Sequence, residues 1–286
     1  MKKLILCFGI WGIGTLWGSC RGQTIELDND TAMFRATFKI EGGGISGTAF
    51  LLTQEVTNKA LLGTNTNSVA LVLVTADHVL SQMNSSNATI YLRFKEGDAY
   101  KKMPVEFPIR ANGTNLWSHH PKADVAAIRP SLTLGKVEIQ SLPEKALADD
   151  QFLDDFKIHP GDELRVLGYP LGFEANDAGF PILRSGRIAS FPLTPFTKYP
   201  TFLLDFQIFE GNSGGPVYIL DRRYMDKSPT SVTIFKIMGL ISEQEWHIDH
   251  LKSYGEESLK RQQLGIGIVI HAQAIKETVA LLPPIQ

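Results

Sequence analysis

Short β-prone runs separated by glycine and proline dominate this sequence and constrain its fold more than any other feature. The runs are rich in β-branched and aromatic residues, which favour a pleated and half-buried surface. Runs of this length at this spacing predict an all-β sandwich or barrel. They cover residues 33–40, 48–53, 70–75, 89–94, 125–128, 163–168, 181–189, 202–206, 216–218, 234–241 and 265–270.

Helical periodicity is clear only near the end of the chain. Ile275, Val279 and Leu282 are spaced so that they share one face of a helix. Pro283 follows them and marks the end of that helix. We therefore expect one short C-terminal helix over residues 272–282.

A polar stretch over residues 131–160 divides the β-rich sequence into two halves, at about 30–130 and 161–271. Its charged residues indicate a connector that has room for a short helix. A second polar stretch, residues 243–263, is also rich in charge. It predicts a surface loop or a short helix within the second half.

The first residues carry the pattern of an export signal. Lys2 and Lys3 form a basic start, an uncharged apolar run follows over residues 4–17, and small residues come next. This pattern predicts a secretory signal peptide over residues 1–22 and a mature domain over 23–286. The apolar run is shorter than the roughly 20 residues that a membrane-spanning helix needs.

Both cysteines, Cys7 and Cys20, lie in this leader, so the mature domain cannot form an internal disulfide. An exported domain without disulfides must be stable on its own core. Cys20 stands where a bacterial lipoprotein signal places its lipidated cysteine, although Trp17 replaces the usual aliphatic residue. Lipidation of Cys20 and plain cleavage near Gly22 both remain open. The expected location is periplasmic, membrane-anchored or secreted.

Charge and composition exclude several classes of partner. The formal net charge is −2 and 20% of the residues are charged, so no basic surplus favours nucleic acid or an anionic membrane surface. His247, Asp249 and His250 lie close enough in sequence to raise a metal-site hypothesis. The charges around them favour a solvated segment instead. The oligomeric state cannot be predicted.

One motif places a serine among glycines, in the sequence Gly211-Asn212-Ser213-Gly214-Gly215. The glycines let the backbone turn tightly and approach a substrate. The N–H groups of Gly211 and Ser213 can then converge on one point and stabilise an oxyanion, typically worth a factor of about 10² to 10³ per donor. Taken alone, the motif fits a glycine-rich hairpin with an incidental serine equally well.

Two further motifs supply partners for Ser213, whose hydroxyl is a poor nucleophile without a neighbouring base. His78 follows an apolar run closely, and a strand end that opens into a helical turn would hold a general base rigidly. Asp124 stands directly before another apolar run, where it can accept the imidazole N–H. Each has an ordinary alternative, namely a surface histidine and a turn residue.

The three motifs follow one another in the order His, Asp, Ser, which is the order of the chymotrypsin-type enzymes. With these motifs the chain resembles the trypsin-like serine peptidases, and most closely the bacterial HtrA (Deg) type protease domain without PDZ domains. The resemblance covers roughly residues 30–282. The matching motifs are Thr75-Ala76-Asp77-His78, Asp124-Val125-Ala126 and Gly211-Asn212-Ser213-Gly214-Gly215-Pro216.

This resemblance implies two six-stranded antiparallel β-barrels with the active site in the cleft between them. His78 and Asp124 would come from the first barrel and Ser213 from the second. The implied activity is hydrolysis of peptide bonds in a protein or peptide substrate through an acyl-enzyme, with no metal and no cofactor. Gly211 and Ser213 would form the oxyanion hole.

The resemblance also places Gln207 at the base of the primary specificity pocket, with Ile241 and Ile266 lining it. Gln207 carries no charge, so a preference for Arg or Lys is not expected, and a small or apolar side chain is favoured. Asn212 stands where digestive enzymes carry an aspartate that pairs with a newly cut N-terminal amine. We therefore predict no activation through such an ion pair.

Two other functions remain open at this point. The sequence around Ser213 also fits the nucleophile elbow of an α/β-hydrolase esterase, in which a strand runs through the serine into a helix. Against it, residues 216–220 favour another strand, and no later histidine stands in a matching context. The third alternative is a catalytically inactive binding module that keeps the trypsin fold.

Overall fold

The computed structural model describes residues 28–57, 67–132, 139–224, 231–253 and 256–285. The predicted signal peptide and both cysteines lie outside these ranges. The side chains between residues 243 and 263 are also outside the description, although most of their backbone is within it.

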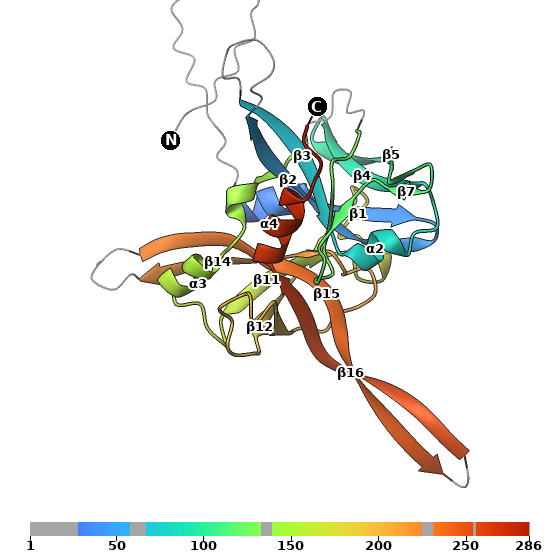
Figure 1. Cartoon of the computed structure of the whole chain (residues 1–286), viewed down its shortest axis with the longest axis vertical. Coiled ribbons are helices and arrows are strands. Elements are labelled where there is room, and N and C mark those ends of the chain that lie inside the picture. Colours follow the sequence, from blue (N-terminus) through green and yellow to red (C-terminus); the bar gives the residue numbers. More distant parts are fainter. Residues whose placement is uncertain (1–27, 58–66, 133–138, 225–230, 254–255, 286) are drawn as a thin grey trace, which may run out of the picture.

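The first half of the chain forms an eight-stranded sheet (Figure 1). Its strands pair in the order β5-β4-β1-β2-β3-β9-β8, and β10 adds beside β2 in parallel. A separate small sheet pairs β6 with β7. The strands are β1 (Thr37–Gly42), β2 (Ile45–Thr57), β3 (Asn67–Thr75), β4 (Asn87–Glu96), β5 (Ala99–Pro108), β6 (Arg110–Ala111), β7 (Thr114–Asn115), β8 (Ser118–His119), β9 (Ala126–Ile128) and β10 (Leu142–Pro143).

The second half forms a closed six-stranded barrel in the order β11-β12-β13-β16-β15-β14. Every neighbouring pair in this barrel is antiparallel. The strands are β11 (Glu163–Gly168), β12 (Ile182–Ile188), β13 (Thr201–Asp205), β14 (Pro216–Tyr224), β15 (Ser231–Ser253) and β16 (Glu256–His271).

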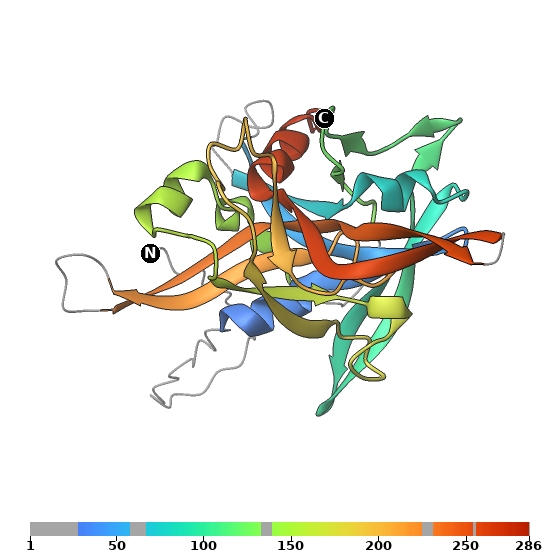
Figure 2. The ribbon, with the colours of Figure 1, turned by 90° about the horizontal axis from the view of Figure 1, so that it is seen from below.

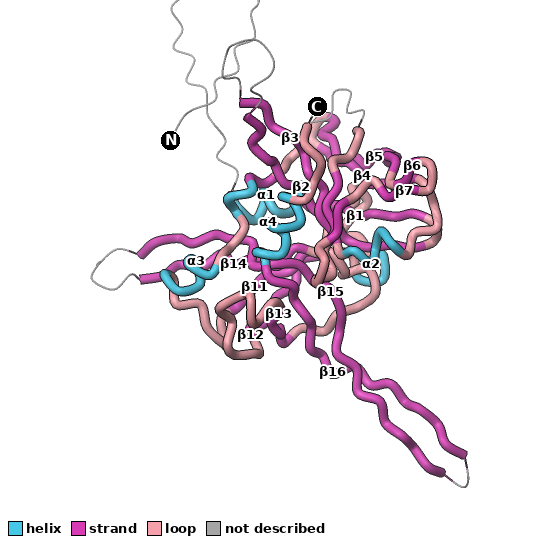
Figure 3. Tube along the Cα trace, in the orientation of Figure 1, coloured by secondary structure: helices cyan, strands magenta, loops and turns pink. Residues whose placement is uncertain are grey.

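The chymotrypsin-like, all-β fold class predicted from the sequence is confirmed, as Figure 3 shows by the predominance of strands. The second half is the expected closed barrel, and the C-terminal helix is α4 (Ala272–Ala280). The first half differs in detail, because its described strands form an eight-stranded sheet instead of a closed barrel of six.

The prediction of a loop or short helix over residues 243–263 is wrong. Strands β15 and β16 continue through this stretch and pair with each other, and their hairpin projects from the barrel in Figure 1. The register sets Asp249 opposite Lys260 and Lys252 opposite Glu257. This pairing continues from the barrel part of the same two strands, so a polar sequence forms strands here.

The helices are short, and one was not expected. The run 33–40 predicts a strand, but its first residues belong to helix α1 and only the rest forms β1. Asp28 caps α1 by accepting a hydrogen bond from the N–H of Thr31, which satisfies a donor of the first turn. Helix α1 covers Asn29–Ala36, and the other α-helices before α4 are α2 (Asp77–Ser81) and α3 (Asp150–Asp155). Two short 3₁₀ helices are η1 (Glu144–Ala146) and η2 (Pro170–Gly172).

One hydrophobic core runs through both halves. Phe50 and Leu73 of the first half belong to the same buried cluster as Leu167 and Ile219 of the barrel. Helix α4 contacts β8 and β9 on one side and β15 and β16 on the other. Helices α1 and α4 overlap in Figure 3, but Figure 2 shows them on opposite sides of the molecule. The two halves are therefore packed together as one body.

Candidate active site

His78 lies in α2, which follows β3 directly, and the next two residues of this helix are buried in the core. The backbone N–H of His78 donates to Oδ1 of Asp124 at 2.9 Å. The ring nitrogen Nδ1 lies 2.6 Å from the other carboxylate oxygen, Oδ2. A carboxylate that binds both the backbone and the ring of one residue fixes the orientation of that ring, which is what a general base requires.

The Asp124 carboxylate lies in the loop before β9 and accepts a third hydrogen bond, from Oγ of Ser242 at 2.5 Å. Burial raises the pKa of Asp124, but the hydrogen bonds from His78 and Ser242 and the charge of His78 outweigh burial. The pKa of Asp124 therefore lies below its ordinary value. The group is ionised at neutral pH and holds the imidazole with its Nδ1–H toward the carboxylate.

Ser213 lies in the turn between β13 and β14. Its Oγ donates to the backbone oxygen of Ser242 at 2.9 Å, and its own carbonyl accepts from the N–H of Thr48 in β2 at 2.9 Å. Ser242 thereby joins Ser213 to Asp124 and His78. We call these four residues, His78, Asp124, Ser213 and Ser242, the polar cluster.

The backbone around Ser213 requires glycine at two positions. Gly211 and Gly214 have φ angles of 90° and 84°, in the region that disfavours side chains. A Cβ on Gly211 would lie 2.2 Å from the carbonyl oxygen of Tyr169, and a Cβ on Gly214 would lie 2.1 Å from that of Thr48. The turn around Ser213 is therefore in close contact with both halves of the molecule.

Two fixed carbonyls determine where the N–H groups of this turn point. The oxygen of Glu210 accepts from Leu171 N at 2.6 Å, and that of Asn212 accepts from Gly215 N at 2.9 Å. In a planar trans peptide the N–H points opposite to the C=O. The N–H of Gly211 therefore points away from Leu171, and within the described chain neither it nor the N–H of Ser213 donates to a backbone carbonyl. Both donors are available for an oxyanion.

Asn212 is buried, with 1% of its surface exposed. Its Oδ1 lies on the side of Gly168, where a Cβ would come within 2.8 Å. Its Nδ2 has no hydrogen-bond partner among the described residues. The side chain at this position is thus neutral and enclosed. The absence of activation through an N-terminal ion pair stays a prediction.

The three residues predicted for the specificity pocket lie in different surroundings. Gln207 is exposed, and its carbonyl accepts from Arg184 at 2.7 Å. Ile266 is half-buried and pairs with Asp205 across β13 and β16. Ile241 is fully buried in the barrel core, although its backbone pairs with Gly214 and Gly215 in the turn around Ser213. Their role in specificity stays a prediction.

Sequence reasoning missed Ser242. The residue lies 118 positions from Asp124 along the chain and contacts it only through the fold. A single serine after an apolar strand carries no signal of this role.

The nucleophile elbow of an α/β-hydrolase is not formed, because strand β14 follows Ser213 where that elbow needs a helix.

Comparison with known families agrees with this geometry. The profile of the family described as trypsin-like peptidase domain matches residues 47–223, more than half of the chain, and this range holds His78, Asp124 and Ser213. The chain belongs to the trypsin-like peptidase family. As a member it is a hydrolase of peptide bonds.

No curated protein sequence matches this peptidase. Two similar solved structures are those of Rv3671c from M. tuberculosis H37Rv. The inactive form of a serine-to-alanine mutant is 18% identical, with a TM-score of 0.45 and coverage of 88% of each chain. The inactive form of the Rv3671c protease is 17% identical, with a TM-score of 0.43 and coverage of 88% of this chain and 90% of the other.

In the described ranges, the peptidase has no group of His, Cys, Asp and Glu side chains arranged to hold a metal ion. The side chains of His247, Asp249 and His250 lie outside the description. Across the same described ranges, no helix has the length and apolar character needed to cross a membrane.

Proposed function

We propose that this peptidase is a serine endopeptidase that cleaves peptide bonds in proteins through an acyl-enzyme. Ser213 is the nucleophile, His78 is the general base, and Asp124 orients His78. The observation that carries the proposal is the continuous hydrogen bonding of the polar cluster, from His78 through Asp124 and Ser242 to Ser213.

The contacts of Asp124 support one tautomer of His78. The ionised carboxylate accepts the Nδ1–H, so the lone pair of the neutral ring is on the other nitrogen, Nε2, which serves as the base. Ser213 then exchanges its hydrogen bond to the Ser242 carbonyl for one to Nε2 when a substrate enters.

In the first chemical step, Ser213 Oγ gives its proton to His78 Nε2 and bonds to the substrate carbonyl carbon. The negative charge moves to the carbonyl oxygen, where the N–H groups of Gly211 and Ser213 stabilise it. His78 then protonates the amide nitrogen, the C–N bond breaks, and the amine leaves. In the second step His78 deprotonates a water, which hydrolyses the ester on Ser213 and restores the enzyme.

For the substrate, we propose a small or apolar side chain before the scissile bond. The support is the uncharged Gln207 at the predicted pocket base, with the half-buried Ile266 on the neighbouring strand. The measurement is a cleavage profile on a peptide library. Preference for Arg or Lys at that position would contradict this part of the proposal.

We also propose that the protein is exported, with lipidation of Cys20 and cleavage near Gly22 as the two alternatives. Mass spectrometry of the mature N-terminus separates them. An acylated Cys20 supports a membrane anchor, and an unmodified N-terminus near Gly22 supports release. Retention of residues 1–22 would contradict export through this signal.

The decisive experiment is covalent labelling with a fluorophosphonate, which reacts with an activated serine. The folded wild-type protein should be labelled, and Ser213→Ala should not. Ser141→Ala is a control that removes a hydroxyl from the connector while leaving the polar cluster intact. Absence of labelling in well-folded wild-type protein would overturn the proposal and favour a binding module.

A further inference from the structure

Arg93 is a buried cation at the contact between the two halves. It lies in β4, where Ile90 and Leu92 alternate into the core, and it breaks that alternation while remaining only 7% exposed. Burial lowers the pKa of its guanidinium, which reflects the cost of removing the charge from water. Within the described chain its hydrogen-bond acceptors are backbone carbonyls and one hydroxyl, with no carboxylate among them.

On the side of the first half, Arg93 binds the end of helix α1. Its Nη2 donates to the carbonyls of Phe34 and Arg35, each at 3.1 Å, and of Thr37 at 2.6 Å. Carbonyls at a helix C-terminus lack partners within the helix and favour a cation. The guanidinium carbon also lies 4.5 Å from the ring centroid of Phe38.

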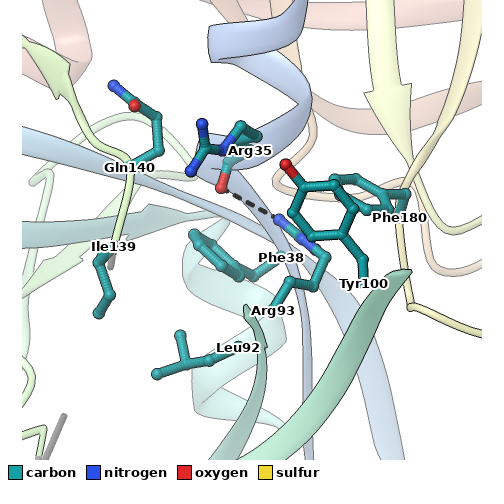
Figure 4. A pocket seen from close by; sticks show the side chains of 8 residues that line it. All are labelled: Arg35, Phe38, Leu92, Arg93, Tyr100, Ile139, Gln140 and Phe180. Carbon is teal, nitrogen blue, oxygen red and sulfur yellow. Dashed lines mark hydrogen bonds between the residues drawn. The ribbon is translucent and has the colours of Figure 1, made fainter. Parts of the chain in front are cut away.

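On the side of the second half, Arg93 binds the loop between β11 and β12. Its Nη1 donates to the carbonyl of Gly179 at 2.9 Å and to the hydroxyl of Tyr169 at 3.2 Å. The ring of Phe180 lies 4.6 Å from the guanidinium carbon, opposite Phe38. Figure 4 shows Arg93 among the side chains of Phe38, Tyr100 and Phe180, and the adjacent space of about 10 Å³ has room for about one water molecule. The guanidinium itself therefore fills most of the space between the two halves here.

Tyr169 connects Arg93 to the turn around Ser213. The tyrosine is fully buried, and its backbone N–H donates to Oγ1 of Thr48 at 3.3 Å. The same Oγ1 donates to the carbonyl of Gly211 at 2.7 Å. The loop that begins at Tyr169 also supplies the N–H of Leu171 that fixes the Glu210 carbonyl.

We propose that Arg93 is a positioning residue for catalysis, which acts through Tyr169 to orient the peptide between Glu210 and Gly211. Arg93 and Tyr169 together are called the arginine clamp. The clamp holds the loop after β11, and that loop holds the Glu210 carbonyl on one side, so the Gly211 N–H points to the other. This inference rests on the proposed function, since it concerns the oxyanion hole of the same site.

Loss of the clamp frees the peptide to rotate. Once the loop after β11 moves, Leu171 no longer holds the Glu210 carbonyl, and the Gly211 N–H leaves the oxyanion position. Removal of one such donor lowers kcat by about 10² to 10³. Substrate binding before the reaction does not use this donor, so KM should change little.

The experiment compares Arg93→Met, Arg93→Lys and Tyr169→Phe with the wild type in steady-state peptide cleavage. Met keeps the length and apolar stem of Arg93 but donates no hydrogen bonds, and we expect kcat to fall about 10²-fold with KM nearly unchanged. Lys restores one point charge but cannot span both sides, so it should rescue only part of kcat. Tyr169→Phe removes one hydroxyl in place and should lower kcat about 10-fold.

A peptide aldehyde gives a second readout, because Ser213 adds to it and forms an oxyanion. Its affinity should weaken in the clamp variants by the same factor as kcat, while the affinity for a cleaved product peptide stays constant. The acid limb of the pH profile should also stay in place, since the contacts between His78 and Asp124 are intact. If Arg93 only stabilised the fold, kcat and the affinity for the aldehyde relative to the product peptide would both stay at their wild-type values.

Arg129→Met is the matched control. Arg129 also holds a backbone carbonyl, that of Pro283, and donates to the side chain of Gln54, and neither of these partners belongs to the turn around Ser213. Equal losses of thermal stability in the Arg93 and Arg129 variants with wild-type kcat in both would overturn the inference. If Arg93→Met does not fold, unchanged kcat in Tyr169→Phe overturns it alone. An inactive wild type would instead defeat the proposed function.

Discussion

The polar cluster and the arginine clamp both lie where the halves of the molecule meet, but they differ in exposure. In the cluster, the side chain of His78, the proposed general base, is 29% exposed. In the clamp, Arg93 is 7% exposed and Tyr169 is fully buried. Groups that exchange protons with a substrate must be reached from solvent, whereas groups that only hold backbone need not be. The comparison separates residues expected to react from residues expected to position.

The largest effect should come from the carboxylate of the cluster. Asp124→Asn keeps the shape of the side chain but removes the charge and the fixed tautomer of His78, so kcat should fall about 10⁴-fold. Peptide cleavage at neutral pH measures it, with the surface variant Asp155→Asn as control. A loss of kcat smaller than about 10-fold would contradict the role of Asp124.

A smaller loss of activity should follow from disturbing the turn around Ser213 where it contacts Tyr169. Gly211→Ala brings a Cβ to 2.2 Å from the Tyr169 carbonyl, so the turn must shift, and kcat should fall about 10² to 10³-fold. Gly161→Ala is the control, because Gly161 also has a positive φ of 93° but has open space around it. Equal losses in both variants would show that backbone strain alone explains the effect.

A milder effect is expected at Ser242. Ser242→Ala removes the hydroxyl that donates to Asp124 but keeps the backbone carbonyl near Ser213, so kcat should fall about 10-fold. Ser242→Thr retains the hydroxyl and should recover most of the activity. Kinetics that do not differ between the Ala and Thr variants would mean that the hydroxyl does not support Asp124.

The smallest effect on activity should come from His271, a buried histidine at the N-terminus of α4. Burial lowers its pKa from the ordinary 6.5 to about 4. The unfolded chain therefore takes up a proton at this residue as the pH falls through about 6.5, while the folded chain does so only near 4. The stability that the neutral ring provides is present above pH about 6.5 and is lost progressively toward pH 4.

His271→Phe should flatten this dependence, since the site already lies beside the rings of Phe196 and Phe202. Urea unfolding of both proteins between pH 7 and 4 measures the difference, with peptide cleavage at neutral pH expected to stay near the wild-type rate. The same slope in both proteins would mean that His271 is not the titrating group.

The residues proposed to react stand out in the sequence because their chemistry leaves a local mark there. Ser213 stands among glycines that the turn needs, and His78 and Asp124 stand beside the ends of apolar strands. Ser242 and Arg93 leave no such mark. A lone serine and a lone arginine in a strand look like surface residues, and only the strand pairing brings them to their partners.

The fold was predictable to a similar extent. Strands with apolar alternation, such as residues 163–168, have the bounds that the sequence indicates. The hairpin over 243–263 was missed because its polar residues carry no apolar period, while its pairing continues from the barrel strands. Helix α1 was missed because an apolar run can form either element, and capping by Asp28 favours the helix.

The central claim is that Ser213, His78 and the N–H of Gly211 act on one carbonyl group. A crystal structure of the protein after reaction with a fluorophosphonate tests this most directly. The account predicts phosphorus bonded to Ser213 Oγ, a phosphonyl oxygen within about 3 Å of the Gly211 and Ser213 nitrogens, and His78 within hydrogen-bond distance of the adduct. A folded protein with the adduct on another residue, or with His78 out of reach of Ser213, would contradict it.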